Sequence, residues 1–228
     1  PPNDTLPRGT SRMTVVMVAT SNTAPENLYE GGLQRALFLP FIALLRERCV
    51  VEEVAGPQDY RRLFRTTHAT YLMPDDEKTA ALLEQMFLDL TRTDTAQPVR
   101  HEVKGHGLTV PRAAHGTAWF TFADLCEQPL GSVDYNLLAG LYHTFFLAHV
   151  PAIHHEARDV ARRFITLIDM LYDHKCKLVI SAAVEPEWIY GAGSLVGEFA
   201  RTVSRLHEMQ SEDWWAEPHR SDLPEGGA

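Results

Sequence analysis

The sequence predicts an α/β fold, and three observations support this class. Apolar runs rich in β-branched residues recur along the chain, as in MTVVMVAT (13–20) and CKLVISAA (176–183). Such runs are typical of strands buried on both faces of a parallel sheet. Segments with apolar residues at helical spacing lie between them, and the joints are short. Strands and helices that alternate with short joints indicate α/β units with right-handed crossovers.

The first α/β unit is expected within residues 13–60. After the strand at 13–20, apolar residues recur at helical spacing from Leu33 to Leu45. Pro40 is compatible with this helix if it lies in the first turn. CVVEEV (49–54) is the expected second strand, which ends before Gly56 and Pro57.

Residues 61–117 show weaker patterning. DEKTAALLEQMFLDL (76–90) predicts one helix, which a Thr-rich loop and a Gly/His-rich stretch follow. We therefore expect a variable connector in this part of the chain.

Order returns in residues 118–215, where a C-terminal α/β module is expected. The predicted strands are 118–122, 145–151 and 176–183, and the predicted helices are 134–143, one from Ala161 to Tyr172, and 197–210. A polar, flexible lead-in, 1–12, precedes the first unit. The Pro/Gly/acid-rich end, 216–228, is expected to be disordered.

Composition excludes some classes of protein. A net charge of -9 provides no basic field for nucleic acid. Three cysteines, far apart and in no C-x-x-C pattern, argue against a disulfide framework or a zinc site and favour a reducing compartment. The longest uncharged stretch, 135–155, contains polar residues and Pro151, so we predict a buried helix and strand there rather than a membrane span.

Motifs for phosphate and metal binding are absent from the sequence. There is no Gly-Lys dipeptide, so the G-x-x-x-x-G-K-[ST] phosphate loop is missing. FITLIDML (164–171) places Met170 where an acidic base would follow Asp169, and its period is helical. His149, His154, His155 and Glu156 lie close in sequence without an H-E-x-x-H pattern, so no metal site is predicted.

Four residues have both a structural and a functional interpretation. Asn22 at the end of a strand is a turn former or an amide that orients an attacking water. Arg35 is a solvated surface arginine or an arginine finger for a transferring phosphoryl group. Arg163 and Arg201 lie on predicted helices, where a solvated face or an ion pair is the ordinary role.

Four long segments carry a family resemblance. ATSNTAPENLYEGGLQRALFLPFIALLRERCVVEEVAGPQDYR resembles the sensor-1 strand, arginine-finger segment and last core strand of the AFG-one-like ATPases, the ZapE family of AAA+ P-loop proteins. FTFADLCEQPLGSVDYNLLAGLYHTFFLAHVP, ARRFITLIDMLYDHKCKLVISAAVEPEWIY and FARTVSRLHEMQSEDWW resemble the C-terminal half of the same family.

The resemblance implies a fold and site residues. Residues 13–60 would form the C-terminal part of a P-loop AAA+ core, and a small α/β module would follow the connector. Asn22 would position the hydrolytic water in cis, and Arg35 would reach the nucleotide site of a neighbouring subunit. Arg163 or Arg201 would approach the nucleotide, and the sequence does not choose between them.

The resemblance also implies cofactors and partners. ATP and Mg²⁺ would bind only together with the family's N-terminal half, because this sequence lacks the phosphate loop and the Asp-Glu magnesium motif. We therefore expect a fragment or truncated product without ATPase activity of its own. The family resemblance implies a homo-oligomer that acts on protein clients, inner-membrane proteins among them. The negative net charge argues against nucleic acid as a partner. The expected roles are protein quality control in mitochondria or, alternatively, division in the bacterial cytoplasm at the inner membrane.

Two other functions are consistent with parts of the sequence. A non-catalytic interaction module with the same fold would bind protein partners near Trp188, Trp214 and Trp215. A metal-dependent enzyme would use the cluster between His149 and Glu156.

Overall fold

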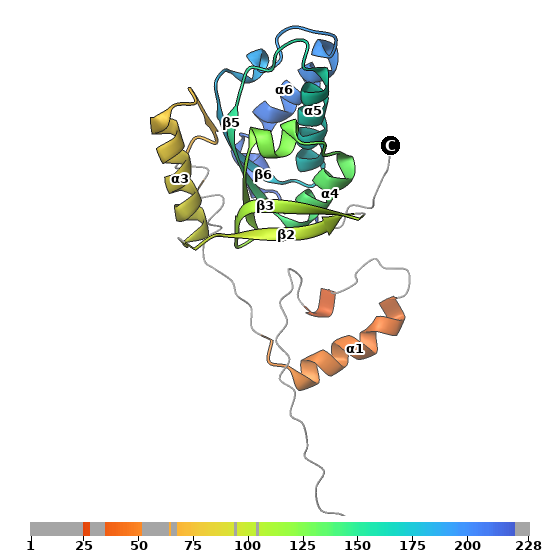
Figure 1. Cartoon of the computed structure of the whole chain (residues 1–228). Coiled ribbons are helices and arrows are strands. Elements are labelled where there is room, and N and C mark those ends of the chain that lie inside the picture. Colours follow the sequence, from red (N-terminus) through yellow and green to blue (C-terminus); the bar gives the residue numbers. More distant parts are fainter. Residues whose placement is uncertain are drawn as a thin grey trace, which may run out of the picture. The chain divides into compact units, whose positions relative to one another are not determined.

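The computed structural model describes residues 25–27, 35–51, 64, 68–93, 95–103 and 105–221 (Figure 1). The chain divides into two compact units, Pro1–Pro57 and Gln58–Ala228. The predicted strand at 13–20, Asn22 and the lead-in at 1–12 lie outside the described residues, as do residues 222–228.

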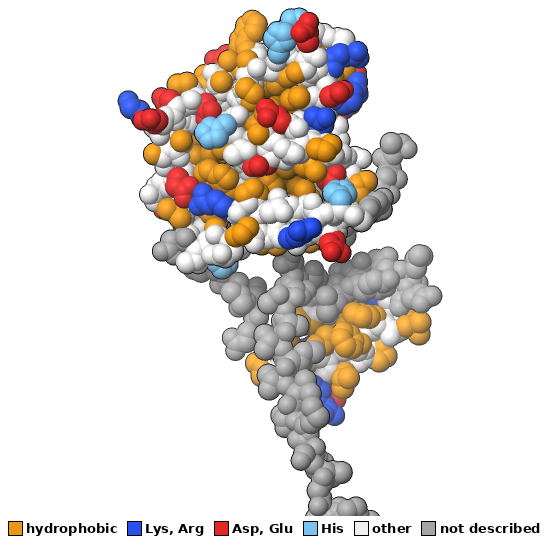
Figure 2. Space-filling view, viewed as in Figure 1, with side chains coloured by type: hydrophobic (Ala, Val, Ile, Leu, Met, Phe, Trp, Pro, Cys, Tyr) orange, Lys and Arg blue, Asp and Glu red, His pale blue; other side chains and the backbone are white. Residues whose placement is uncertain are grey.

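The first unit contains a short 3₁₀ helix, η1 (Pro25–Asn27), and the helix α1 (Arg35–Arg48). The helix was expected, but Pro40 is its sixth residue and does not lie in the first turn. A proline at this position cannot donate the usual hydrogen bond to the carbonyl four residues earlier. Ile42 is the buried residue of α1, and several of its apolar side chains are largely exposed (Figure 2): Leu37, Leu39, Phe41 and Leu44.

The predicted strand at 49–54 is not formed where the structure describes it. Cys49, Val50 and Val51 follow α1 in irregular backbone, and Val50 is 87% exposed. A strand requires a partner for its backbone N–H and C=O groups. The described residues of this unit include no strand that provides one.

The second unit is built on one six-stranded sheet of order β1-β6-β5-β4-β3-β2. The four strands from β1 to β4 in this order are parallel, and the β2–β3 hairpin joins them antiparallel. The strands are β1 (Tyr71–Leu72), β2 (Gln97–Val103), β3 (His106–Ala114), β4 (Thr117–Thr121), β5 (Thr144–Val150) and β6 (Lys177–Ala182).

Helices cover both faces of this sheet. The helix α3 (Glu77–Thr91) packs on β5 and β6. The helices α4 (Ser132–Leu141), α5 (Arg158–Asp173) and α6 (Val196–Glu208) pack in sequence against one another away from α3 (Figure 1). Two short helices, η3 (Pro186–Trp188) and α7 (Glu212–Ala216), flank α6 in the chain. The β4-α4-β5-α5-β6 order confirms the α/β class.

The prediction that 61–117 is a variable connector is corrected by the structure. This segment supplies three strands of the sheet as well as α3. The helix predicted at 76–90 is confirmed as α3, and Asp76 caps it by accepting a hydrogen bond from the backbone N of Thr79 (2.8 Å). The sequence pattern did not predict the β2–β3 hairpin, because β2 is an edge strand with mostly exposed or half-buried residues. Such a strand lacks the apolar run that marks a central strand.

The strands and helices predicted in 118–210 are confirmed, with ends shifted by one to three residues. The uncharged stretch at 135–155 forms most of α4 and all of β5. No helix in the described part of the chain combines the length and apolarity needed to cross a bilayer.

The described part of the tail, residues 216–221, is bonded to the sheet domain, contrary to the expectation of disorder. The ammonium of the buried Lys177 donates to the carbonyls of Trp214 (2.6 Å) and Glu217 (2.8 Å). The backbone N of Arg220 donates to the carbonyl of His174 (2.8 Å). These bonds supply order that the polar composition of the segment does not predict.

Candidate functional site

Arg35 is the first residue of α1. Its guanidinium Nη2 donates to the backbone carbonyl of Glu26 in η1 (2.8 Å). This bond ties the start of the helix to the segment that follows Asn22 in the chain. Asn22 itself lies outside the described residues.

A pocket of about 370 Å³ lies between α4 and α5 in the second unit. It is lined by Leu130, Gly131, Ser132, Tyr135, Asp159, Arg162, Arg163 and Thr166. These residues come together because α4 precedes β5 and α5 follows it in the chain, and the two helices pack against one another.

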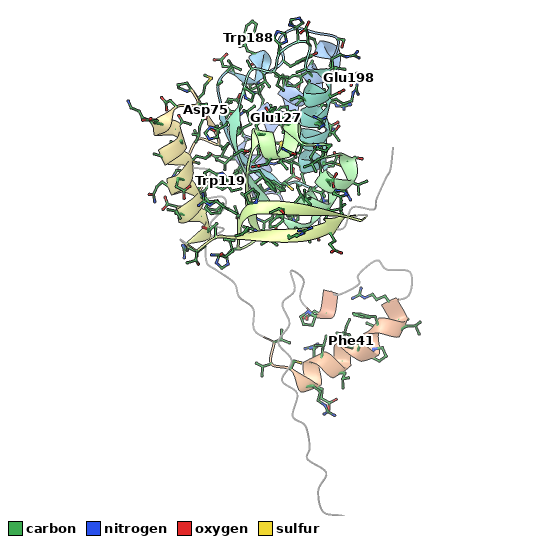
Figure 3. The ribbon with its side chains drawn as sticks, in the orientation of Figure 1. Phe41, Asp75, Trp119, Glu127, Trp188 and Glu198 are labelled. Atoms are coloured by element: carbon green, nitrogen blue, oxygen red, sulfur yellow. The ribbon has the colours of Figure 1, made fainter. Side chains whose placement is uncertain are left out.

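The charge of this pocket is set by two arginines and one aspartate. Arg163 donates from Nη1 to the backbone carbonyl of Cys126 (2.7 Å), and Arg162 contacts Glu198 of α6 at 3.3 Å. Figure 3 labels Glu198 at the start of α6. Guanidinium groups and the amino end of a helix both favour anions. The two guanidinium groups therefore give this pocket positive charge, and Asp159 adds one negative charge to its lining.

A five-residue π-helix, η2 (Ala123–Glu127), joins β4 to α4 beside the pocket. Two hydrogen bonds hold η2 in place. Tyr135 donates to the carbonyl of Leu125 in η2 (2.7 Å), and the Asp124 side chain accepts from the backbone N of Thr121 at the end of β4 (2.7 Å). Burial raises the pKa of the Cys126 thiol well above its ordinary value. The thiol therefore stays protonated at neutral pH, which makes it a poor nucleophile.

Arg201 lies in a different environment from Arg163. Its Nη2 contacts Oδ2 of Asp169 at 2.6 Å, and Arg205 binds the other oxygen of the same carboxylate. Asp169 is on α5 and both arginines are on α6, so these contacts join the two helices. Arg201 does not line the pocket. The structure therefore does not bring the two candidate arginines together.

The histidines near the end of β5 do not form one cluster. The rings of His154 and His155 lie 4.2 Å apart, and His154 contacts the exposed Glu156 at 3.8 Å. His149 instead pairs with Asp75, a partner that sequence reasoning missed. No group of three metal-ligating side chains occurs among the residues that the structure describes. The arrangement proposed for a metal-dependent enzyme is therefore not formed.

The three tryptophans proposed as partner anchors divide into two kinds. Trp214 and Trp215 are each 1% exposed, and Trp214 stacks on Tyr172. They belong to the core, so the expectation that they bind partners is wrong. Trp188 in η3 is 63% exposed, and Figure 3 labels it at one end of the domain.

Comparison with known proteins identifies the family. The model of the AFG1-like ATPase family matches residues 8–218. The chain belongs to this family. Among similar proteins, the uncharacterized protein C115.02c of Schizosaccharomyces pombe is 37% identical over 234 residues, which cover 90% of this chain and 52% of that protein.

Two other relatives give the same assignment. Lactation elevated protein 1 homolog B of Danio rerio is 34% identical, over 91% of this chain and 48% of its own length. Cell division protein ZapE of Escherichia coli is 36% identical, over 90% of this chain and 55% of its own length. The chain thus spans about half the length of these relatives. No solved structure matches the chain.

Proposed function

We propose that this chain is the C-terminal portion of an AFG1-like ATPase and supplies two residues to ATP hydrolysis. The observation that carries the proposal is the family match over residues 8–218, which includes both the segment around Asn22 and the segment around Arg35. In this proposal the Asn22 amide orients the attacking water in its own subunit. Arg35 stabilises the charge that develops on the γ-phosphate bound by a neighbouring subunit.

Arg163 is the better of the two candidates for a further nucleotide contact. It lines a pocket with a second arginine and the start of α4, whereas Arg201 is bonded to Asp169. Arg163 is bonded to the neutral carbonyl of Cys126, whereas Arg201 would have to give up a stronger, charge-assisted bond to a carboxylate before it could bind a phosphate. We therefore assign the nucleotide contact to Arg163 and a structural role to Arg201.

The phosphate loop and the magnesium ligands would come from the part of the family that this chain does not match. The sequence has no Gly-Lys dipeptide, so it lacks the lysine and backbone amides that hold the β- and γ-phosphates. Mg²⁺, when bound, would neutralise charge on these phosphates. The 228-residue chain by itself is predicted to have no ATPase activity.

The proposed assembly is a homo-oligomer, because an arginine finger acts across a subunit interface. We propose that the assembly hydrolyses ATP to act on protein clients, including inner-membrane proteins. A mitochondrial location is proposed, with the bacterial cytoplasm at the inner membrane as the alternative. Cell fractionation tests this location directly.

A chimera tests the proposed catalytic role. This chain replaces the segment of E. coli ZapE that it matches, and steady-state ATP hydrolysis is measured for the chimera and for its Arg35→Ala variant. An arginine finger accounts for about a thousandfold in turnover, so a loss of that order is expected. Arg46→Ala, in the last turn of the same helix, is the matched control and should leave turnover unchanged.

A second candidate function, a non-catalytic interaction module, is supported by the exposure of Trp188. An exposed tryptophan is a common anchor in protein interfaces. This function predicts a folded chimera whose ATP hydrolysis is insensitive to Arg35→Ala. The same measurement therefore separates the two functions.

A further inference from the structure

A second polar cluster lies at the carboxyl ends of three neighbouring parallel strands. His149 is in β5, Ser181 is in β6, and Asp75 lies three residues beyond the end of β1. Figure 3 labels Asp75 beside the start of α3. Ligands of open α/β sheets bind at this edge. None of the three residues lines the pocket beside Arg163.

The position of His149 is unusual within its strand. Every other residue of β5 is buried, whereas the His149 side chain is 57% exposed. Its φ of 63° lies in the left-handed region, and the β5–β6 register shifts between Leu147 and Val150. Bulges of this kind redirect a side chain and are frequent next to active sites. Here the bulge turns an imidazole out of a buried strand.

Hydrogen bonds on the Nδ1 side of the ring fix the orientation of the His149 imidazole. The backbone N of His149 donates to Ser181 Oγ (2.9 Å), and this hydroxyl donates to Asp75 Oδ1 (3.0 Å). Nδ1 of His149 lies 2.9 Å and 3.1 Å from the two oxygens of the same carboxylate. Ser181 is fully buried, and the Asp75 side chain is 18% exposed. The three residues form a closed ring of bonds that joins β5, β6 and the segment between β1 and α3.

This ring decides which nitrogen of neutral His149 carries the proton. An ionised carboxylate only accepts hydrogen bonds, so Nδ1 must be the donor to Asp75. The neutral ring then has its lone pair on Nε2. Within the described residues, no protein group bonds Nε2. An Asp–His pair with a free Nε2 is the arrangement that orients a histidine as a base.

The same bonds exclude Ser181 as a nucleophile. In a Ser-His-Asp triad, the hydroxyl donates to the imidazole Nε2. Here the Ser181 hydroxyl donates to Asp75 and accepts from the backbone of His149, on the side of the ring opposite to Nε2. The nucleophile must therefore come from outside the cluster.

We propose that His149, positioned by Asp75 and Ser181, is a general base for a hydroxyl nucleophile, either water or an alcohol. In the step, Nε2 removes the hydroxyl proton while the oxygen forms a bond to an electrophilic carbon, and the bond from that carbon to the leaving group breaks. The imidazolium is stabilised by Asp75 and gives its proton to the leaving alkoxide, or to solvent when the leaving group departs as a stable anion such as p-nitrophenolate. With an ester and water, the products are an acid and an alcohol, and no redox partner is needed.

The probe is p-nitrophenyl acetate, hydrolysed by the full chain at about pH 8, above the range in which histidine side chains ordinarily titrate. His149→Asn should lower the rate at least about tenfold, and asparagine tolerates the left-handed backbone at this position. His154→Asn is the matched control, because His154 is similarly exposed but its carboxylate partner, Glu156, is itself exposed and lies 3.8 Å away. The wild-type rate should also fall in D₂O, because the proton moves in the rate-limiting step.

The role of Asp75 has its own readout. Asp75→Asn leaves one oxygen to accept from both Nδ1 and Ser181, so the His149 ring should shift toward the Nε2–H form. Ring ¹⁵N chemical shifts report this change independently of rate. A wild-type ring with its proton on Nε2, equal rates for His149→Asn and His154→Asn, or no solvent isotope effect would each overturn the proposal. None of these results depends on ATP hydrolysis, so they leave the proposed ATPase role unaffected.

Discussion

Arg163 and Cys126 are joined by a hydrogen bond of 2.7 Å from the guanidinium Nη1 to the backbone carbonyl. The bond links α5, a crossover helix, to the π-helix η2 that follows β4. One side chain thus fixes the wall of the pocket and presents charge to it. The structural bond and the proposed nucleotide contact of Arg163 are tested by two different measurements on the same variant.

Arg163→Ala should destabilise the domain by about 2 kcal/mol, because the carbonyl of Cys126 loses a charged donor. Urea unfolding of the chain measures this change. In the ZapE chimera the same variant should also weaken ATP binding. Arg162→Ala is the control for the unfolding measurement, since Arg162 lines the same pocket and contacts an exposed carboxylate at 3.3 Å. Unchanged stability of Arg163→Ala would contradict the structural part of this account.

Arg201→Ala should change ATP binding by the chimera much less than Arg163→Ala does. Arg201 is 60% exposed in its ion pair with Asp169, and exposed pairs contribute little to stability. The measurement is a titration of each variant with a fluorescent ATP analogue. A larger loss of affinity for Arg201→Ala would reverse our choice between the two arginines.

Lys177→Met should destabilise the domain by about 3 kcal/mol, since the carbonyls of Trp214 and Glu217 lose their bonds to the buried ammonium. Urea unfolding measures the loss, and Lys78→Met on the exposed side of α3 is the control. Stability equal to that of the control would show that Lys177 does not hold the tail.

Trp214→Ala and Trp188→Ala should differ sharply. Trp214 is 1% exposed, so its removal should cost about 3 kcal/mol or more of folding stability. Trp188 is 63% exposed, and its removal should cost little. Thermal unfolding of both variants tests the assignment of Trp214 to the core. Equal losses would contradict it.

The Glu84–Arg112 pair predicts a specific sensitivity to acid. Nη1 and Nη2 of the Arg112 guanidinium donate to the Glu84 carboxylate, at 2.6 Å and 2.7 Å, and these bonds lower the pKa of Glu84. The resulting stabilisation is present above the ordinary glutamate pKa of about 4.3 and is lost as the pH falls through the lowered value. Glu84→Gln should therefore lose less stability than the wild type over that range. Parallel acid-unfolding curves would contradict this prediction.

The central strands and crossover helices were predictable from the sequence. The strands are buried on both faces of the sheet, and each helix is buried along one apolar face. β5 and β6 are almost entirely buried, and α5 carries six buried residues at helical spacing: Ala161, Phe164, Ile165, Leu167, Ile168 and Leu171. The hairpin of β2 and β3 was missed because an edge strand exposes much of its surface. Its identity depends on pairing with β4, which local sequence does not show.

The candidate site was predictable only in part. Arg163 was identified from its family segment, but its pocket depends on how α4 and α5 pack. The Asp75–His149–Ser181 ring joins residues 106 positions apart in the chain, so no local pattern indicates it. The one sequence signal was the polar residue near the end of each apolar strand, as in FFLAHVP and KLVISAA. That signal places residues at a common edge without showing which of them bond.

The most direct test of the central claim is ATP hydrolysis by mixed oligomers of the ZapE chimera. Asn22→Ala and Arg35→Ala chimeras, each inactive alone, are mixed and allowed to exchange subunits. An Arg35→Ala subunit keeps Asn22, and an Asn22→Ala subunit keeps Arg35. If Asn22 acts in cis and Arg35 in trans, some interfaces between these two kinds of subunit contain both residues intact. Turnover should then partly return. A mixture that exchanges subunits yet stays as inactive as its components would contradict the assignment of Arg35 as a residue acting across the subunit interface.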